Sequence, residues 1–412
     1  MPADLGHPSP LAASARWRML VLICAGVVGV LATWFSATAI LPDLTRAWDL
    51  SPSQAAWMTN AVQLGFVAGA LAASLVNLPD LVAMHRLMAA SATLAAAANA
   101  ALLITGPDGA LVARFVTGVA LAGVYPPALK LMATWFVKGR GLALGFLIGA
   151  LTLGSSMPHL VRALAAGLDW RAVVWATSAA ALVSASVFLT LLREGPHPFG
   201  RATFDPRKAL AVFTNRPLLL ANIGYFGHMW ELYAMWAWIL AFATAAQAGL
   251  HPFPFGSASM FSFAVVASGA LGCLLGGWLS DRIGRCLTCA GMMAVSATCA
   301  ALIGAFFNGP ALVLGLLALI WGISVIGDSA QFSAAVTELA DSAFVGTALT
   351  LQMGLGFALT VVAIWGLPLF ADLIGGWQWA FLFLLPGPLI GTGAMLALRA
   401  HPDARKLAQG AR

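Results

Sequence analysis

The sequence predicts an all-α membrane protein with twelve transmembrane helices arranged as two six-helix repeats. Of its 412 residues, 61% are hydrophobic and only 9% are charged, whereas about a quarter of the residues in an ordinary soluble domain are charged. The apolar residues form long continuous runs, and about 20 such residues let a helix cross the roughly 30 Å hydrocarbon core of a bilayer. A β-barrel would instead alternate polar and apolar positions over segments of about 10 residues. The runs therefore indicate helices, and the chain length allows about a dozen of them.

Each helix is predicted from an apolar run that Pro, Gly or charged residues interrupt at both ends. The first run extends from Met19 to about Leu41. It is longer than the core of a cleaved signal peptide, which has about 7 to 15 residues, and is therefore the first crossing. Eleven further runs follow, and each has the length of a crossing. The predicted helices are 17–41, 55–76, 87–105, 110–136, 142–166, 172–192, 217–245, 257–280, 286–307, 310–338, 347–371 and 379–399.

The longest polar interval, 193–216, separates the sixth and seventh helices and divides the chain into two sets of six. The predicted domains are therefore 1–192, a central cytoplasmic loop at 193–216, and 217–412. The two sets also look like repeats. Asp80 and Asp281 each follow the second helix of a half, Gly141 and Gly346 each open the fifth, and both pairs lie roughly 200 residues apart. Repeats of this kind place a substrate site near the membrane midplane, between the halves.

The distribution of Lys and Arg predicts the orientation in the membrane. On the side opposite the N-terminus the loops contain only Arg46 and Arg171, with Arg162 near a helix end. By the positive-inside rule both termini are cytoplasmic, in a multi-pass protein of a cell membrane, here expected to be a bacterial inner membrane. The net charge is +6, but the sequence contains no basic cluster with interleaved aromatic residues. No nucleic-acid partner is therefore expected. The loops on the N-terminal side hold Arg16, Arg18, Arg86, Lys138, Arg140, Arg193, Arg201, Arg207, Lys208, Arg216, Arg282, Arg285, Arg399, Arg405, Lys406 and Arg412.

Cysteine and methionine residues raise a metal-binding alternative. All five cysteines lie in or beside apolar runs, so a disulfide framework of the secreted kind is not expected. Cys286 and Cys289 form a CxxC pair, but there is no second pair and no nearby His to complete a site. Met229 and Met235 flank Glu231 but fall on different helix faces, which disfavours a soft-metal site. The sequence therefore predicts no metal and no cofactor.

The segment 277–285, GWLSDRIGR, lies between the second and third helices of the second half. This segment matches the pattern of Gly, a hydrophobic residue, Asp, Arg, Gly and Arg that is typical of the major facilitator superfamily of secondary transporters. The chain resembles that superfamily over essentially its whole length. The resemblance implies that Asp281 favours the N-terminal end of a helix in the other half. It also implies that Arg282 and Arg285 pair with acidic or backbone groups on the cytoplasmic face, although both could serve only topology. With Asp80, whose surroundings lack the glycines and arginines of the pattern, they form the predicted cytoplasmic gate.

The same resemblance implies that the first, fourth, seventh and tenth helices line a central cavity. At 100° per residue, Tyr225, His228, Glu231 and Met235 share one stripe of the seventh helix, and Met229 lies off it. On the tenth helix Trp321, Ser324, Asp328 and Gln331 share a stripe, and on the fourth Arg114 is either a helix-end anchor or faces substrate. The predicted pathway residues are Glu231, His228, Asp328, Arg114, Tyr225, Trp321, Gln331 and Met235, with Asn60, Gln63 and Gln352 as further hydrogen-bonding candidates.

Glu231 lies near the middle of the seventh apolar run, where an ionisable group is costly and indicates function. A carboxyl group in an apolar cavity can take up and release a proton as the cavity changes sides. Asp328 is then a second proton carrier, or a partner for a cationic group of the substrate. The alternative is a purely structural pair between Glu231 and His228 or a residue of a neighbouring helix.

These residues predict a proton-coupled secondary transporter of a small organic solute, working by alternating access. Within the superfamily, the branch that the chain resembles is the nitrate and cyanate type of bacterial porters. Such porters hold their anion with an Arg in the second and the eighth helix, but 55–76 and 257–280 contain no Arg or Lys. A small inorganic anion is thus disfavoured, and the aromatic residues suit a solute that stacks or carries positive charge. The expected partners are the solute, protons and the lipid bilayer, and the protein is expected to act as a monomer.

Two other classes of function were considered. A non-transporting sensor or assembly factor could use the same scaffold, but the chain has no appended soluble domain to transmit a signal. An enzyme is not predicted, because the sequence contains no nucleophile and base pair and no nucleotide-binding motif.

Overall fold

The computed structural model describes residues 10–76, 78–136, 140–165, 167–197, 214–341 and 345–412, without the side chains at 10–13, 79, 80, 140 and 141. Within these ranges the regular structure is helical, and eleven helices are long and apolar enough to cross a membrane. The helix α12 (Arg216–Gln247) is 32 residues long and is the twelfth; its His, Glu, Tyr and Trp residues lower its hydropathy. The all-α fold and the twelve-helix count predicted from the sequence are confirmed.

The helices begin and end within a few residues of the predicted limits, apart from the first. Those of the first half are α1 (Pro10–Leu31), α2 (Ser36–Ala39), α3 (Leu41–Trp48), α4 (Pro52–Leu75), α5 (Leu78–Leu81), α6 (Met84–Ala100), η1 (Ala101–Leu103), α7 (Pro107–Ala122), α8 (Tyr125–Trp135), α9 (Arg140–Leu164) and α10 (Arg171–Leu191). After α12 follow α13 (Ala258–Ile283), α14 (Arg285–Leu302), η3 (Ile303–Phe306), α15 (Ala311–Gly327), α16 (Ser329–Leu339), α17 (Val345–Leu373), η4 (Ala380–Leu384), α18 (Pro386–Ala400) and η5 (Pro402–Gly410).

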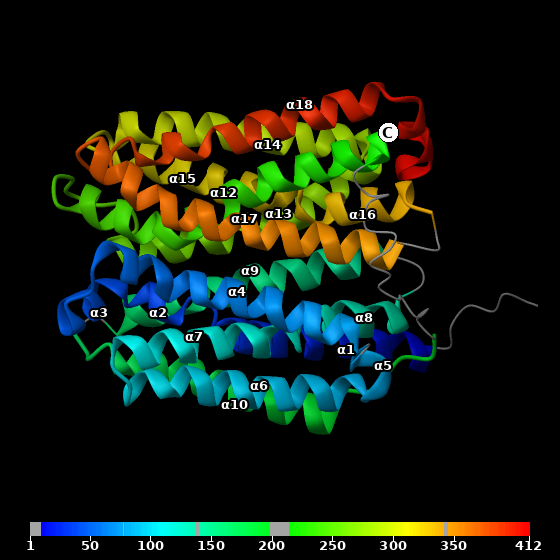
Figure 1. Cartoon of the computed structure of the whole chain (residues 1–412), viewed down its shortest axis with the longest axis horizontal. Coiled ribbons are helices and arrows are strands. Elements are labelled where there is room, and N and C mark those ends of the chain that lie inside the picture. The colour runs from blue at the N-terminus through cyan, green and yellow to red at the C-terminus, as the bar shows by residue number, and fades with distance from the viewer. Residues whose placement is uncertain (1–9, 77, 137–139, 166, 198–213, 342–344) are drawn as a thin grey trace, which may run out of the picture.

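The long helices form two bundles that lie side by side, α1 to α10 in one and α12 to α18 in the other (Figure 1). Two helix pairs join the bundles, α4 with α17 and α9 with α13. Small residues let α9 and α13 approach closely: Gly149 lies against Ala270, and the hydroxyl of Thr152 is 3.8 Å from the sulfur of Cys273. Since lipid is as apolar as the side chains, packing of small residues is a main source of helix association in membranes.

The first, fourth, tenth and twelfth predicted helices are interrupted, the twelfth at Leu385, and these breaks were not predicted. The first stops at Leu31 and resumes at Ser36, the fourth is divided between Ala122 and Tyr125, and the tenth is divided at Asp328. In the fourth, Pro126 and Pro127 lack the N–H groups that would continue the hydrogen-bond ladder across the break. In the tenth, the backbone at Gly327 lies so close to Gly276 of α13 that a side chain at Gly276 would clash with it. Interrupted helices leave backbone groups to be paired by other means.

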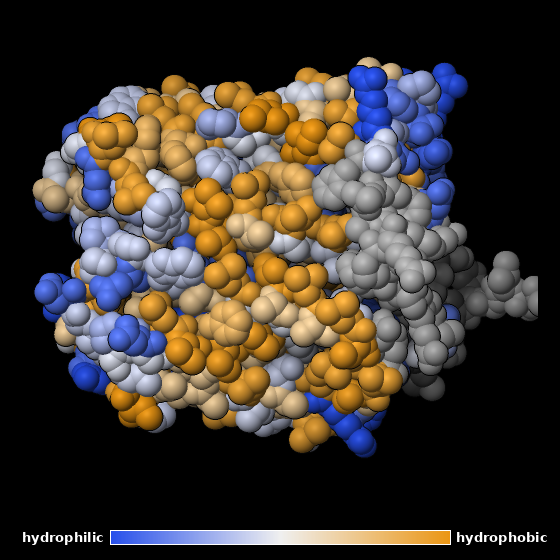
Figure 2. All heavy atoms as spheres, in the orientation of Figure 1, coloured by the Kyte–Doolittle hydropathy of each residue, from blue (hydrophilic) through white to orange (hydrophobic). Residues whose placement is uncertain are grey.

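The surface agrees with a membrane-spanning bundle. Figure 2 shows hydrophobic residues over the middle of the visible face and hydrophilic residues towards both ends of the long axis. Large apolar side chains such as Ile104, Trp175 and Leu373 are exposed. Such exposure is unusual on a soluble monomer but expected where lipid covers the protein.

Candidate functional site

Glu231 lies on α12 and is almost completely buried, with 1% of its surface exposed. Its Oε1 accepts hydrogen bonds from the hydroxyl of Ser296 on α14 and the indole N–H of Trp321 on α15, both at 2.7 Å. The indole N–H also lies 3.1 Å from the Ser296 hydroxyl. One carboxylate oxygen therefore ties three helices of the second half together, with partners that favour its charged form.

His228 and Asp328 form a second buried polar pair, about one helical turn from Glu231. The His228 Nδ1 and Asp328 Oδ1 atoms are 2.9 Å apart, and each side chain is 1% exposed. The ring N–H is not aligned with the oxygen, so neither Asp328 oxygen has a hydrogen-bond partner in the described part of the chain. The Nε2 atom of His228 is likewise unpaired there. Phe332 lies beside the imidazole, with ring centroids 5.3 Å apart.

The orientation of α12 differs from the predicted stripe. Tyr225 and Met229, expected on different faces, both pack against Gly356 of α17, whereas Glu231 is directed at α14 and α15. Met235 is fully buried. Since residues on every side of α12 are buried, the spacing of its polar residues does not reveal which neighbour each one faces. The prediction that Glu231 shares a face with Tyr225, and that Met229 lies off it, is therefore wrong.

Arg114 is fully buried in the first half and neither anchors a helix end nor faces the other bundle. Its Nη1 donates to the carbonyl of Thr33 at 2.8 Å, its Nε donates to the carbonyl of Met58 at 3.2 Å, and its Nη2 donates to the carbonyl of Trp34. In the described ranges no carboxylate lies within ion-pair distance of the guanidinium. Arg114 thus supplies donors to the backbone where the first helix is interrupted.

Asn99 extends this network, and the sequence analysis missed it. Its Oδ1 accepts from the hydroxyl of Ser36 at 2.5 Å, and its amide donates to the hydroxyls of Thr177 and Ser178 on α10, both at 2.9 Å. Arg114 Nη1 reaches the same Ser36 hydroxyl at 3.1 Å. The signal was the one amide side chain in the alanine-rich segment that forms α6. Each half therefore contains one buried polar network that joins several of its helices.

Six aromatic side chains meet between the two halves and are called here the aromatic cluster. Trp34 is stacked on Tyr233 with centroids 5.7 Å apart, and Phe66 contacts Phe357 at 4.7 Å. All six are at most 5% exposed. Its members are Trp34, Phe35 and Phe66 of the first half and Tyr233, Trp236 and Phe357 of the second.

Several buried polar atoms of α4, of α17 and of the aromatic cluster itself have no hydrogen-bond partner in the described part of the chain. Both amide atoms of Gln63 on α4 and of Gln352 on α17 are unpaired, as are the indole N–H groups of Trp34 and Trp236. Asn60 is partly paired: its amide nitrogen donates to the carbonyl of Val361 at 3.2 Å and so links α4 to α17, whereas its Oδ1 is unpaired in the described residues. A buried polar group without a partner costs about 1–3 kcal/mol. Such groups indicate a place where a ligand or water supplies the missing partner.

The predicted gate residues of the second half lie where α13 ends and α14 begins. Arg285 donates to Glu338 through Nε at 2.8 Å and to Gln331 through Nη1 at 2.7 Å. Gln331 is thus bound to the gate residue Arg285, although we predicted it in the pathway. The guanidinium of Arg282 lies 4.0 Å from the centre of the Trp278 ring, and Asp281 is exposed. The side chain of Asp80 lies outside the described residues.

Metal ligands do not gather anywhere in the ranges that the structure describes: no three His, Cys, Asp or Glu residues are close enough to hold an ion. All five cysteines are free, including Cys286 and Cys289.

The site lies in two bundles of membrane-spanning helices, some of which are interrupted. The chain belongs to the major facilitator superfamily, whose family model matches residues 21–364. It is therefore a multi-pass membrane protein of this superfamily.

The relatives cover different shares of the chain. The uncharacterized transporter YgaY of Escherichia coli O157:H7 is 30% identical over 166 residues, which is 39% of this chain and only 41% of that transporter. A probable sulfoacetate transporter, SauU, of Cupriavidus necator is 24% identical over 354 residues, covering 73% of this chain and 75% of its own length. The crystal structure of the nucleoside transporter NupG superimposes with a TM-score of 0.72 at 17% identity, covering 92% of this chain and 99% of that one. The last comparison shows the fold alone.

Proposed function

We propose that this protein moves a small organic solute across the membrane by alternating access, coupled to protons through Asp328 and His228. The observation that carries the proposal is the Asp328 carboxyl group. It lies where the tenth helix is interrupted and is 1% exposed, and neither of its oxygens has a hydrogen-bond partner in the described part of the chain, where His228 Nδ1 lies 2.9 Å from Oδ1. A buried carboxylate without donors is costly, so loss or gain of its proton favours different conformations.

Glu231 now has a different proposed role from that of Asp328. Its charged form has two hydrogen-bond donors, Ser296 and Trp321, which tie it to neighbouring helices. This arrangement supports the structural alternative that the sequence analysis kept open. We therefore assign proton coupling to the Asp328 and His228 pair, and to Glu231 the stabilisation of the second half.

The solute is proposed to bind between the halves, near the unpaired groups. Gln63 and Gln352 offer amide donors and acceptors, and the indole N–H of Trp34 is a further donor beside a stacked aromatic ring. Amides and aromatic faces recognise polar, flat solutes such as heteroaromatic rings. Arg114 is not available to an anion because its nitrogens are bound to backbone carbonyls.

An organic anion is the second candidate, because SauU is a probable sulfoacetate transporter. The geometry of Arg114 argues against this candidate, as does the absence of Lys and Arg from residues 55–76 and 257–280. For the orientation, we propose cytoplasmic termini in a bacterial inner membrane, from the excess of Lys and Arg at that end. A fluorescent tag that matures only in the cytoplasm, fused after Arg412, tests this orientation.

The test uses purified protein in liposomes with an imposed pH gradient. A thermal-shift panel of nucleosides, aromatic carboxylates and sulfoacetate first identifies a solute that stabilises the wild type. We then expect gradient-driven transport by the wild type and by Glu231→Gln, and loss of the response to the gradient in Asp328→Asn. Glu231→Gln is the matched control, since it neutralises another buried carboxyl on the same half. Transport by Asp328→Asn that follows the gradient as in the wild type would refute the proposed coupling.

A further inference from the structure

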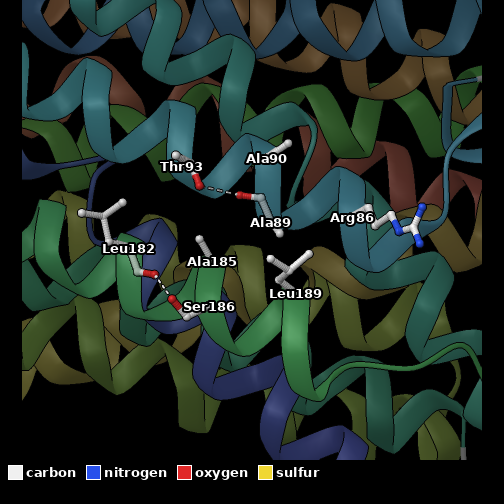
Figure 3. Close-up of a pocket in the computed structure, with 8 residues that line it drawn as sticks. All are labelled: Arg86, Ala89, Ala90, Thr93, Leu182, Ala185, Ser186 and Leu189. Atoms are coloured by element: carbon white, nitrogen blue, oxygen red, sulfur yellow. Dashed lines mark hydrogen bonds between the residues drawn. The ribbon is translucent and has the colours of Figure 1, made fainter.

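A groove lies on the surface of the first half between α6 and α10 and has a volume of about 380 Å³ (Figure 3). Several of its side chains are exposed, among them Ala90, Leu182 and Leu189, so the groove opens to the outside of the bundle. Both helices are long and apolar enough to cross a membrane. The lining residues are Arg86, Ala89, Ala90, Thr93, Leu182, Ala185, Ser186 and Leu189.

The groove is apolar along most of its length. The hydroxyl of Thr93 donates to the carbonyl of Ala89 at 3.0 Å, and that of Ser186 donates to the carbonyl of Leu182 at 3.2 Å (Figure 3). Both hydroxyls are thus bound to their own helices, and apart from Arg86 the other lining side chains are hydrocarbon. From Arg86 to Thr93 the groove follows α6 for about 10 Å, given a rise of 1.5 Å per residue.

A single cation, Arg86, marks one end of the groove. Arg86 is the third residue of α6, is exposed, and makes no ion pair within the described ranges. The nearby carboxylate of Glu194 accepts a hydrogen bond from the backbone N–H of Met84 at 3.2 Å. Figure 3 shows Arg86 at one end of the row of lining residues and Leu182 at the other. The end with Arg86 is also the end at which most Lys and Arg residues lie, where lipid headgroups are found.

We propose that this groove binds one anionic phospholipid, with an acyl chain between α6 and α10 and the phosphate at Arg86. The surface lies within the bilayer, so a lipid is the molecule in contact with it. An apolar channel with one cation at its headgroup end complements a lipid with a negative headgroup. Basic sites at helix ends on the cytoplasmic side recognise such headgroups, and one cation contributes about 1 kcal/mol near a charged membrane surface.

The test measures lipid retained by the purified full-length protein in native mass spectrometry, with phosphatidylglycerol and phosphatidylcholine of the same acyl chains. We expect the wild type to retain phosphatidylglycerol preferentially. Arg86→Gln is expected to weaken its binding about fivefold, and Ala90→Leu, which fills the groove at an exposed position, to weaken it as well. Circular dichroism and a melting curve establish that each variant is folded.

Two controls separate the groove from general surface charge and bulk. Arg216→Gln removes another exposed arginine at the start of a helix, and Ala294→Leu adds the same bulk at an exposed position of α14. Both are expected to bind phosphatidylglycerol like the wild type. Equal retention of the two lipids by the wild type would overturn the proposal, and so would an effect of Arg216→Gln as large as that of Arg86→Gln. Retention unchanged by Ala90→Leu would also overturn it, because the headgroup contact would then not need the groove.

Discussion

The Nη1 atom of Arg114 donates a hydrogen bond to the carbonyl oxygen of Thr33 at 2.8 Å, at the point where the first helix is interrupted. This contact links α7 to the segment between α1 and α2. It also fixes the backbone that precedes Trp34 and Phe35, whose rings meet Tyr233 and Trp236 of the other half. A buried cation in one half thereby positions aromatic side chains that contact the other half.

The first prediction concerns Arg114→Met, which keeps much of the side-chain volume but removes every donor. We expect a loss of about 2–4 kcal/mol of stability, because several carbonyls become unpaired in a buried site. Arg114→Lys should recover little of this, since one ammonium group cannot reach the carbonyls of Thr33, Trp34 and Met58 in the geometry of the guanidinium. Thermal unfolding in detergent measures both changes.

The control for Arg114 is Arg46→Met. Arg46 is largely exposed and pairs with Asp43 at 2.7 Å on the surface, where ion pairs contribute little. Its melting temperature should be close to that of the wild type. Equal melting temperatures for Arg114→Met and Arg46→Met would mean that the buried network does not stabilise the first half.

The second prediction concerns the partners of Glu231. Ser296→Ala removes one donor and should cost about 1 kcal/mol, and Trp321→Phe should cost more, because the indole N–H contacts both Glu231 and Ser296. Unfolding of detergent-solubilised protein gives both values. Thr298→Ala is the matched control, since the Thr298 hydroxyl is exposed and bonds only to the carbonyl of Ala294 on its own helix. A cost for Thr298→Ala as large as that for Ser296→Ala would contradict the inferred role of the network.

The helix limits could be predicted from the sequence, but the faces of the helices could not. Apolar runs and their Pro and Gly boundaries are local signals, so α4, α9 and α17 lie close to their predicted ranges. The orientation of Glu231 depends on which helices surround α12, and that is a tertiary property. Because α12 is buried on all sides, its hydrophobic pattern does not show whether the stripe with Glu231 or the stripe with Met229 faces a given neighbouring helix.

Only some of the interruptions of the helices could be predicted from the sequence. Pro126 and Pro127 are visible in the sequence and mark the break in the fourth helix. The break in the first helix has no such signal, because the backbone there is stabilised by Arg114, which lies about 80 residues further along the chain. The aromatic cluster was hidden for the same reason: Phe66 and Phe357 meet only after the two halves pack.

The third prediction concerns the C-terminal segment. The carboxylate of Glu338 accepts from Arg285 and from the backbone N–H of Ala408 at 3.0 Å, so it holds η5 against the end of the second half. Glu338→Gln weakens both contacts because the neutral amide is a poorer acceptor. We expect faster hydrogen exchange at Pro402–Gly410, by about fivefold. Glu194→Gln, at the same end of the first half, should leave this exchange unchanged.

The last prediction tests the orientation of α12 with two glycines of α17. A Cβ at Gly356 would clash with the ring of Tyr225 and lie 3.1 Å from Met229, whereas a Cβ at Gly354 would meet only Leu71, at 4.0 Å. Gly356→Ala should therefore destabilise the protein by about 1–3 kcal/mol through overpacking. Gly354→Ala should stabilise it by about 0.5–1 kcal/mol, because alanine favours the helix.

The two substitutions are chemically identical and only two residues apart, so helix propensity contributes equally to both. The difference in melting temperature between Gly356→Ala and Gly354→Ala reports only the space at each site. In a double-mutant cycle, Gly356→Ala should cost less stability in the Tyr225→Ala background than in the wild type, since the side chain that obstructs the new methyl group is then absent. A stabilising Gly356→Ala would place Tyr225 and Met229 away from α17 and would restore the helix face predicted from the sequence.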